Sequence, residues 1–270
     1  MQPRPDAQQP EGSLREGFDA QTRVLGALIV RDLMTRFGRA NVGFLWVILE
    51  PMLLVSLVLL VRAAIFPPYE HDLEMVVIVL TGYMPLTLYR HITNIGPNLY
   101  RRSIPFLYHR HITFLDVLLA RSALEFAATT AALVAVYAIL LTLQVCSPMK
   151  DPGLCAAGWF TMGYLSFGLA SLLAILTEVS DTAERFIQPL QYIMLPISGT
   201  FYMIAWLPSS VQEVAWYIPL VHCYEMFRAG FFGEEVQTTY AVWYPVAWGT
   251  VMAALGIGLI DYVRDRVHTG

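Results

Sequence analysis

Charge is scarce in this chain and absent from long parts of it. Asp, Glu, Lys and Arg make up 14% of the 270 residues, against about a quarter in soluble domains. Four intervals contain none of them: Glu125 to Lys150, Asp151 to Glu178, Arg185 to Glu213 and Glu235 to Asp261. Each holds 24 to 27 residues, which as a helix exceeds the roughly 30 Å hydrocarbon core of a bilayer. An integral membrane protein is therefore expected.

Catalytic motifs are also missing. The sequence has no His-Glu-x-x-His, Gly-x-Ser-x-Gly or Gly-x-x-x-x-Gly-Lys pattern and no cysteine pair at metal-binding spacing. We therefore expect no catalytic residue, no metal and no cofactor on this chain. The net charge of −4 argues weakly against a nucleic-acid partner.

Two further apolar segments, each interrupted by a charge, raise the number of expected spans to six. One carries Glu50 directly before Pro51, and the other carries Arg90, so both place a charge inside the membrane, where charges are functional candidates. The predicted fold class is all-α, with six transmembrane helices in one domain over residues 39–265. The spans are expected at about residues 44–66, 75–97, 113–145, 153–177, 185–205 and 238–261.

Arginine indicates which side of the membrane each loop faces. Six arginines precede residue 44, three follow the second span and two lie in the C-terminal tail. The opposite loops hold only Arg62, Lys150 and Arg228 among eight acidic residues. By the positive-inside rule, both termini are expected in the cytoplasm.

The cytoplasmic N-terminal part is expected in two pieces. Residues 1–17 read as a disordered tail. Over residues 18–38, the apolar side chains of Leu25, Leu28 and Leu33 recur at helical spacing, which predicts an amphipathic helix lying on the inner leaflet.

Cys146 and Cys155 flank a short loop on the outer side, where the compartment is oxidising. A disulfide between them is one interpretation, and two buried thiols are the other. Cys223 has no evident partner.

Residues 206–235 are too apolar for a free loop, but Pro208 and Pro219 divide them into pieces too short to span. They are expected to form a short re-entrant outer hairpin, with Glu225 and Arg228 as an ion pair at i and i+3. A second ion pair is expected four residues apart, between Arg121 and Glu125.

The basic loop 98–111 has two interpretations of about equal weight, a lipid-binding anchor and a protein-docking segment.

Two stretches of the sequence resemble a known family. The run Arg36-Phe37-Gly38-Arg39-Ala40-Asn41-Val42-Gly43-Phe44-Leu45-Trp46, followed by Glu50-Pro51, resembles the first span of type 2 ABC transporter permeases that export polysaccharides. Pro219-Leu220-Val221-His222, with Glu225, Arg228, Phe231 and Phe232, resembles that family's outer hairpin. The short loop 67–74 is unlike that of the drug or haem exporters, which insert a large outer domain there. The form of the first span, with Trp46 ahead of Glu50-Pro51, is most like the capsular polysaccharide exporters of Gram-negative inner membranes.

The resemblance implies partners. Two copies of the chain would enclose a canal lined mainly by spans one, two and five, and two separate ATPase subunits would bind ATP and Mg on the cytoplasmic face. It implies a lipid-linked polysaccharide as cargo, and periplasmic and outer-membrane capsule export proteins beyond. Residues implied in ATPase coupling are Arg31, Phe37, Arg101, Arg102, Phe106, His109 and Arg110.

A polymer path needs cationic attraction at its entrance and weak repeated contacts inside. Arg36, Arg39 and Arg90 are candidates for attracting an acidic lipid terminus, with lipid anchoring as the alternative. Aromatic candidates for stacking on sugars, or alternatively for the interfacial belt, are Tyr83, Tyr192, Phe201, Tyr202 and Trp206. O-antigen or teichoic-acid export, lipid or drug export, and an intramembrane enzyme are the other functions considered.

Overall fold

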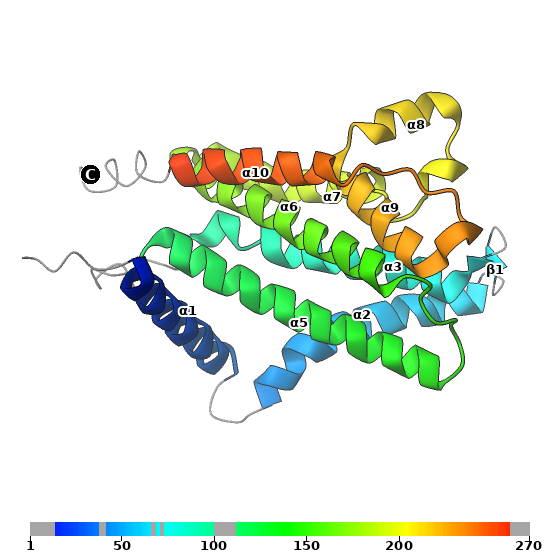
Figure 1. Cartoon of the computed structure of the whole chain (residues 1–270), viewed down its shortest axis with the longest axis horizontal. Coiled ribbons are helices and arrows are strands. Elements are labelled where there is room, and N and C mark those ends of the chain that lie inside the picture. The colour runs from blue at the N-terminus through cyan, green and yellow to red at the C-terminus, as the bar shows by residue number, and fades with distance from the viewer. Residues whose placement is uncertain (1–13, 38–41, 66–68, 71–72, 100–111, 260–270) are drawn as a thin grey trace, which may run out of the picture.

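The computed structural model describes residues 14–37, 42–65, 69–70, 73–99 and 112–259 (Figure 1). Most of them are helical, which confirms the all-α class. The described strands are two residues each: β1 (Tyr69–Glu70) pairs antiparallel with β2 (Leu73–Glu74).

Seven long helices make up the body of the molecule. They are α1 (Leu14–Phe37), α2 (Val42–Ile65), α3 (Met75–Thr93), α5 (Phe114–Thr142), α6 (Pro152–Val179), α7 (Asp181–Ile197) and α10 (Trp243–Gly258). Shorter elements connect them: η2 (Gly96–Asn98), η3 (Ile204–Trp206), α8 (Ser209–Trp216), α9 (Pro219–Phe232) and η4 (Gly233–Glu235). Within the described residues, α3, α5 and α6 are long and apolar enough to cross a membrane.

Several expected boundaries differ from the structure. The last span is expected from residue 238, and α10 begins at Trp243. The helix expected over 185–205 ends at Ile197, because Gly199 takes φ +95° and the chain then runs irregularly to η3. The tail expected over 1–17 is shorter, since α1 already begins at Leu14. Residues 1–13 lie outside the described parts of the chain.

The long helices form two layers with α3 between them. α5 packs against α1 and α2 on one side, and α6 packs against α7, α9 and α10 on the other. α3 contacts α2 and α5 of the first layer and α6 and α9 of the second. α5 and α6 meet through side chains, with the ring centres of Phe126 and Phe160 5.1 Å apart. In the second layer, the approach of α6 to α10 is close enough that a Cβ on Gly168 would meet the backbone of Gly249.

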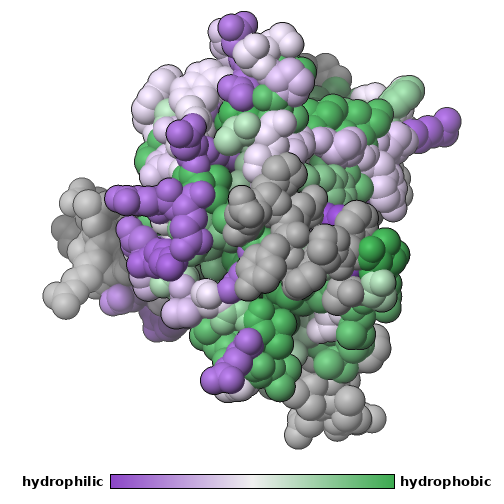
Figure 2. All heavy atoms as spheres, turned by 90° about the vertical axis from the view of Figure 1, so that its right-hand side faces the viewer, coloured by the Kyte–Doolittle hydropathy of each residue, from purple (hydrophilic) through white to green (hydrophobic). Residues whose placement is uncertain are grey.

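The two ends of this bundle are built differently (Figure 1). One end holds α1, the start of α5 and the last turn of α10, and we call it the α1 end. The other holds α8, α9 and the small β-ladder, and we call it the hairpin end. Figure 2 shows the hairpin end from outside, with hydrophilic side chains gathered over it and hydrophobic ones around its lower part.

Candidate functional site

The hairpin end is organised around a buried arginine. Arg228 of α9 has 0% of its surface exposed. Its Nη1 donates to the carbonyls of Gly199 (2.8 Å) and Tyr202, and its Nη2 donates to the carbonyl of Thr200 (2.8 Å). The irregular segment after α7 leaves these carbonyls without helical partners, and the planar guanidinium satisfies three of them.

Glu225, one turn earlier on α9, also binds backbone groups, in this case two amides. Its carboxylate accepts from the amide N–H of Ile204 (3.0 Å) and of Thr239 (3.2 Å). Burial raises the pKa of this carboxyl, and the two amides and the charge of Arg228 oppose that rise. The ion pair expected between Glu225 and Arg228 is not a direct contact between these two described side chains, because each is used to satisfy loop backbone.

His222, fully buried on α9, is the third side chain that fixes the hairpin. Its Nδ1 accepts from the amide of Ala241 (3.1 Å), so the ring is the tautomer whose Nε2 donates to the carbonyl of Trp216 (2.7 Å). Burial lowers the pKa of this imidazole, and the neutral form is the one that fits both contacts.

The α1 end is held by contacts between side chains of different helices. Asp32 of α1, 7% exposed, pairs with Arg121 of α5 at 2.9 Å and also accepts from its neighbour Arg31 at 3.0 Å. Three turns earlier, Gln21 donates to Asp116 at 3.2 Å. Asp116 also closes the capping box that starts α5 after Thr113. The pair expected between Arg121 and Glu125 is therefore replaced by one that joins two helices.

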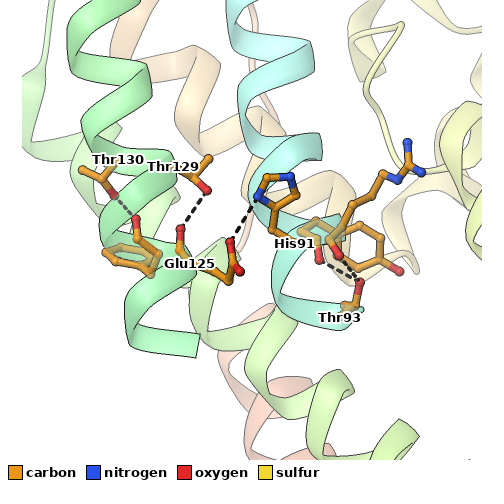
Figure 3. A network of polar contacts seen from close by, with 8 residues as sticks. His91, Thr93, Glu125, Thr129 and Thr130 are labelled. Carbon is orange, nitrogen blue, oxygen red and sulfur yellow. Dashed lines mark hydrogen bonds and ion pairs between the residues drawn. The ribbon is translucent and has the colours of Figure 1, made fainter. Parts of the chain in front are cut away.

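Glu125 instead faces α3, as Figure 3 shows. Its Oε2 lies 3.3 Å from Nδ1 of His91, and both side chains are largely buried. Around this contact, Thr129 donates to the carbonyl of Glu125 and Thr93 donates to that of Tyr89 (Figure 3). These hydroxyls bond within their own helices, which leaves the contact between Glu125 and His91 as the described ionisable link from α5 to α3.

Four of the predicted path residues meet in pairs between α3 on one side and α7 with the segment that follows it on the other. The guanidinium of Arg90 lies 5.5 Å from the ring centre of Tyr192. Two turns along α3, the ring of Tyr83 lies 5.9 Å from that of Phe201 in an edge-to-face arrangement. Tyr192 and Phe201 remain 58% and 46% exposed, so this surface offers aromatic faces to a ligand. We call these four residues the α3–α7 seam.

The seam is backed by a weak polar contact. Gln191, next to Tyr192 and buried, places its Nε2 at 3.4 Å from Oγ1 of Thr93. That distance is long for a hydrogen bond, so little polar interaction holds the two helices together at this level.

The remaining predicted path residues lie elsewhere. Tyr202 belongs to the segment that Arg228 holds, and its hydroxyl donates to the carbonyl of Ile197 at 2.7 Å. Trp206 is in η3 and packs against the hydrophobic core.

Several predicted residues cannot be placed by side chain. Arg36, Phe37 and Glu50 lie in α1 and α2, but their side chains are outside the described parts, and so are Arg39, Arg101, Arg102, Phe106, His109 and Arg110 entirely.

The structure has Cys146 and Cys155 as free thiols, so it adopts the buried-thiol alternative and not the disulfide. The Cys155 thiol lies 3.6 Å from the carbonyl of Phe227, which packs it against α9. Burial and the nearby Glu74 raise the pKa of the Cys146 thiol, which disfavours the reactive thiolate.

Comparison with known proteins covers almost the whole chain. It is 33% identical over 256 residues to the capsule polysaccharide export inner-membrane protein CtrC of Neisseria meningitidis serogroup B, covering 95% of this chain and 97% of that protein. This chain belongs to the capsule polysaccharide export inner-membrane proteins. Its family also includes BexB of Haemophilus influenzae, 29% identical over 95% of this chain and 97% of BexB.

A more distant relative is the polysialic acid transport protein KpsM of Escherichia coli, 25% identical over 92% of this chain and 95% of KpsM. No family model matches the chain. The comparisons confirm the predicted family of this capsule-export protein and the expectation that it is an inner-membrane transport protein.

Sequence reasoning missed three polar residues of this capsule-export protein. The sequence pattern singles out neither Asp32 nor His91, and it includes His222 only in the motif that resembles the family's outer hairpin. One signal in the sequence could have identified Asp32. It lies one turn after the apolar Leu28, and both side chains are buried on the same face of α1.

Proposed function

We propose that this chain is the transmembrane permease subunit of an ATP-driven exporter that moves lipid-linked capsular polysaccharide across the inner membrane. The observation that carries this is similarity over nearly the full length of proteins named for capsule polysaccharide export, at up to 33% identity among those compared. Similarity confined to a shared transmembrane pattern would not extend to 97% of the relative's length.

The proposed arrangement has six spans with both termini in the cytoplasm. The long charge-free intervals and the side preference of arginine support it. Two copies would form the canal, with α2, α3 and α7 as the helices of the first, second and fifth spans. Two separate ATPase subunits would supply ATP and Mg, and periplasmic and outer-membrane capsule export proteins would receive the polymer.

Within this arrangement the α3–α7 seam is the proposed polymer contact. Aromatic rings stack on the apolar faces of sugars. Partly exposed rings such as Tyr192 and Phe201 would give contacts weak enough for the polysaccharide to slide past them. Arg90, held over the Tyr192 ring, keeps a cation beside those rings for an acidic sugar or a phosphate.

The function is tested in the bacterium that carries the gene. We expect deletion to abolish surface capsule, leaving lipid-linked polymer inside the cell, and the tagged chain to co-purify with a nucleotide-binding subunit. Tyr192→Ala should reduce surface capsule, whereas Tyr217→Ala should not, since Tyr217 is an exposed tyrosine (72%) at the hairpin end, away from the seam. Normal capsule in the deletion strain would contradict the proposal.

A further inference from the structure

The two-layer architecture gives α3 a special position. The helix contacts both layers and carries Tyr83 and Arg90 of the α3–α7 seam. The longest helices of the two layers, α5 and α6, also meet through side chains, since Trp159 donates to Thr130 at 2.8 Å. A displacement of the first layer can therefore reach the seam through α3, the helix on which Arg90 and Tyr83 lie. The side chains that join α3 to the first layer at the α1 end decide how well it does so.

The first step joins α1 to α5. Asp32 and Arg121 make a 2.9 Å contact in which both side chains are about nine-tenths buried. Gln21 and Asp116 add a second contact at the start of α5. Two attachment points about three turns apart on α1 keep the helix from rotating independently of α5.

The second step joins α5 to α3. Glu125 lies one turn beyond Arg121 on the same face of α5, and its carboxylate lies 3.3 Å from His91 (Figure 3). His91 is the residue after Arg90, so a shift of this turn of α3 also moves the guanidinium that lies over Tyr192.

The hairpin end of the seam is fixed. A Cβ on Gly82 of α3 would lie 2.5 Å from the carbonyl oxygen of Thr200, whose segment Arg228 holds by three hydrogen bonds. The contact between α3 and the segment after α7 is thus anchored near Tyr83 and Phe201. At the α1 end, the 3.4 Å contact between Gln191 and Thr93 offers little resistance to separation.

We propose that Asp32, Arg121, Glu125 and His91 are positioning residues that carry a displacement of α1 to the α3–α7 seam, which opens at Arg90 and Tyr192 while it stays closed at Tyr83 and Phe201. This rests on the proposed function, in which an ATPase subunit acts on the cytoplasmic face. The four side chains contact no polymer themselves. They couple ATP hydrolysis to movement of the seam.

The test compares two single variants, Asp32→Asn and His91→Gln, in the exporter complex purified with its ATPase and reconstituted in lipid vesicles. ATP hydrolysis and transfer of the native glycolipid are measured together. We expect each variant to assemble with the ATPase and to hydrolyse ATP within about twofold of the unmodified complex, and to transfer glycolipid at least about threefold more slowly. The ratio of polymer moved to ATP consumed is the quantity that falls.

The double variant shows whether the two contacts act in series or contribute to packing independently of each other. If the links act in series, breaking one already interrupts transmission, so Asp32→Asn with His91→Gln transfers glycolipid no more slowly than the slower single variant. The matched control is Arg23→Gln on α1, an exposed arginine whose Nε donates to the carbonyl of Asp19, and it should transfer as the unmodified complex does.

Three results contradict the proposal in distinguishable ways. Losses that multiply in the double variant, or equal losses of hydrolysis and transfer with a matching fall in thermal stability, overturn the coupling role and leave the proposed function intact. An unmodified complex that hydrolyses ATP but moves no glycolipid overturns the proposed function and this inference with it.

Discussion

The two ends of the bundle use buried polar groups in opposite ways. At the hairpin end, Glu225 and Arg228 bond to backbone amides and carbonyls, whose positions the chain itself fixes. At the α1 end, Asp32 and Glu125 bond to side chains of other helices. Backbone partners hold a loop in one conformation, whereas two side chains can follow each other through a range of helix positions.

This difference teaches where such a transporter can move. A charge buried against backbone has a single good geometry, because any shift leaves several groups unsatisfied at once. A pair of long side chains tolerates a shift by changing rotamers. We infer a rigid hairpin end and an articulated α1 end.

The largest expected effect comes from Arg228→Met at the rigid end. The substitution keeps an apolar stem but leaves three carbonyls without this donor, and the two buried ones, of Gly199 and Thr200, cost roughly 1–3 kcal/mol each. We expect a large loss of folded protein and of the thermal midpoint in detergent. Arg185→Met, at an exposed arginine of α7, is the matched control and should change little. Equal midpoints for the two variants would refute the rigid assignment.

Gly82→Val should cost less, about 1–3 kcal/mol from overpacking. The new Cβ meets the Thr200 carbonyl oxygen at 2.5 Å, and that backbone cannot retreat because Arg228 holds it. Chemical unfolding in detergent measures the loss. The control, Gly26→Ala in α1, has no atom within 4 Å of the added Cβ and should be neutral or slightly stabilising.

A pH effect is expected next, from His222. Burial lowers the pKa of this imidazole below that of the unfolded chain, so between about pH 7 and pH 5 the unfolded chain takes up a proton that the folded hairpin resists. Stability is then full above the unfolded pKa and falls as the pH drops. Thermal midpoints across this range should fall more steeply for the unmodified protein than for His222→Asn. Thermal midpoints that fall equally with pH in both proteins would contradict a contribution of His222 to the pH dependence of stability.

The smallest effect is expected from Lys150→Gln. The Lys150–Glu235 pair lies at the hairpin end at 3.1 Å, but the two side chains are 51% and 58% exposed. Water screens such a pair, so its loss should change stability by less than about 1 kcal/mol. A larger loss would mean that exposed charges, and not buried contacts to backbone, give the hairpin end its rigidity.

Much of this architecture could be predicted because lipid imposes it. The expected spans 113–145 and 153–177 match the helices α5 and α6 to within a few residues. The end of α7 at Ile197 could not be predicted, because the irregular segment after it is stable only when Arg228 reaches its carbonyls.

The candidate site was predicted residue by residue but not as pairs. The sequence identifies Arg90 as a charge within an apolar segment and Tyr192 as an aromatic residue. Their contact could not be predicted, because it depends on how α3 and α7 pack. Spacing along one helix suggests Arg121 with Glu125, since residues four apart face the same way. Tertiary packing brings Asp32 to that arginine instead.

Hydrogen exchange on the assembled exporter, with and without a non-hydrolysable ATP analogue, tests the comparison most directly. Our account predicts that the analogue changes amide exchange at the start of α5, over residues 114–125, and at the end of α3, over residues 86–93. Exchange over residues 199–232 at the hairpin end should stay the same. Changes concentrated in residues 199–232, with none at the α1 end, would contradict it.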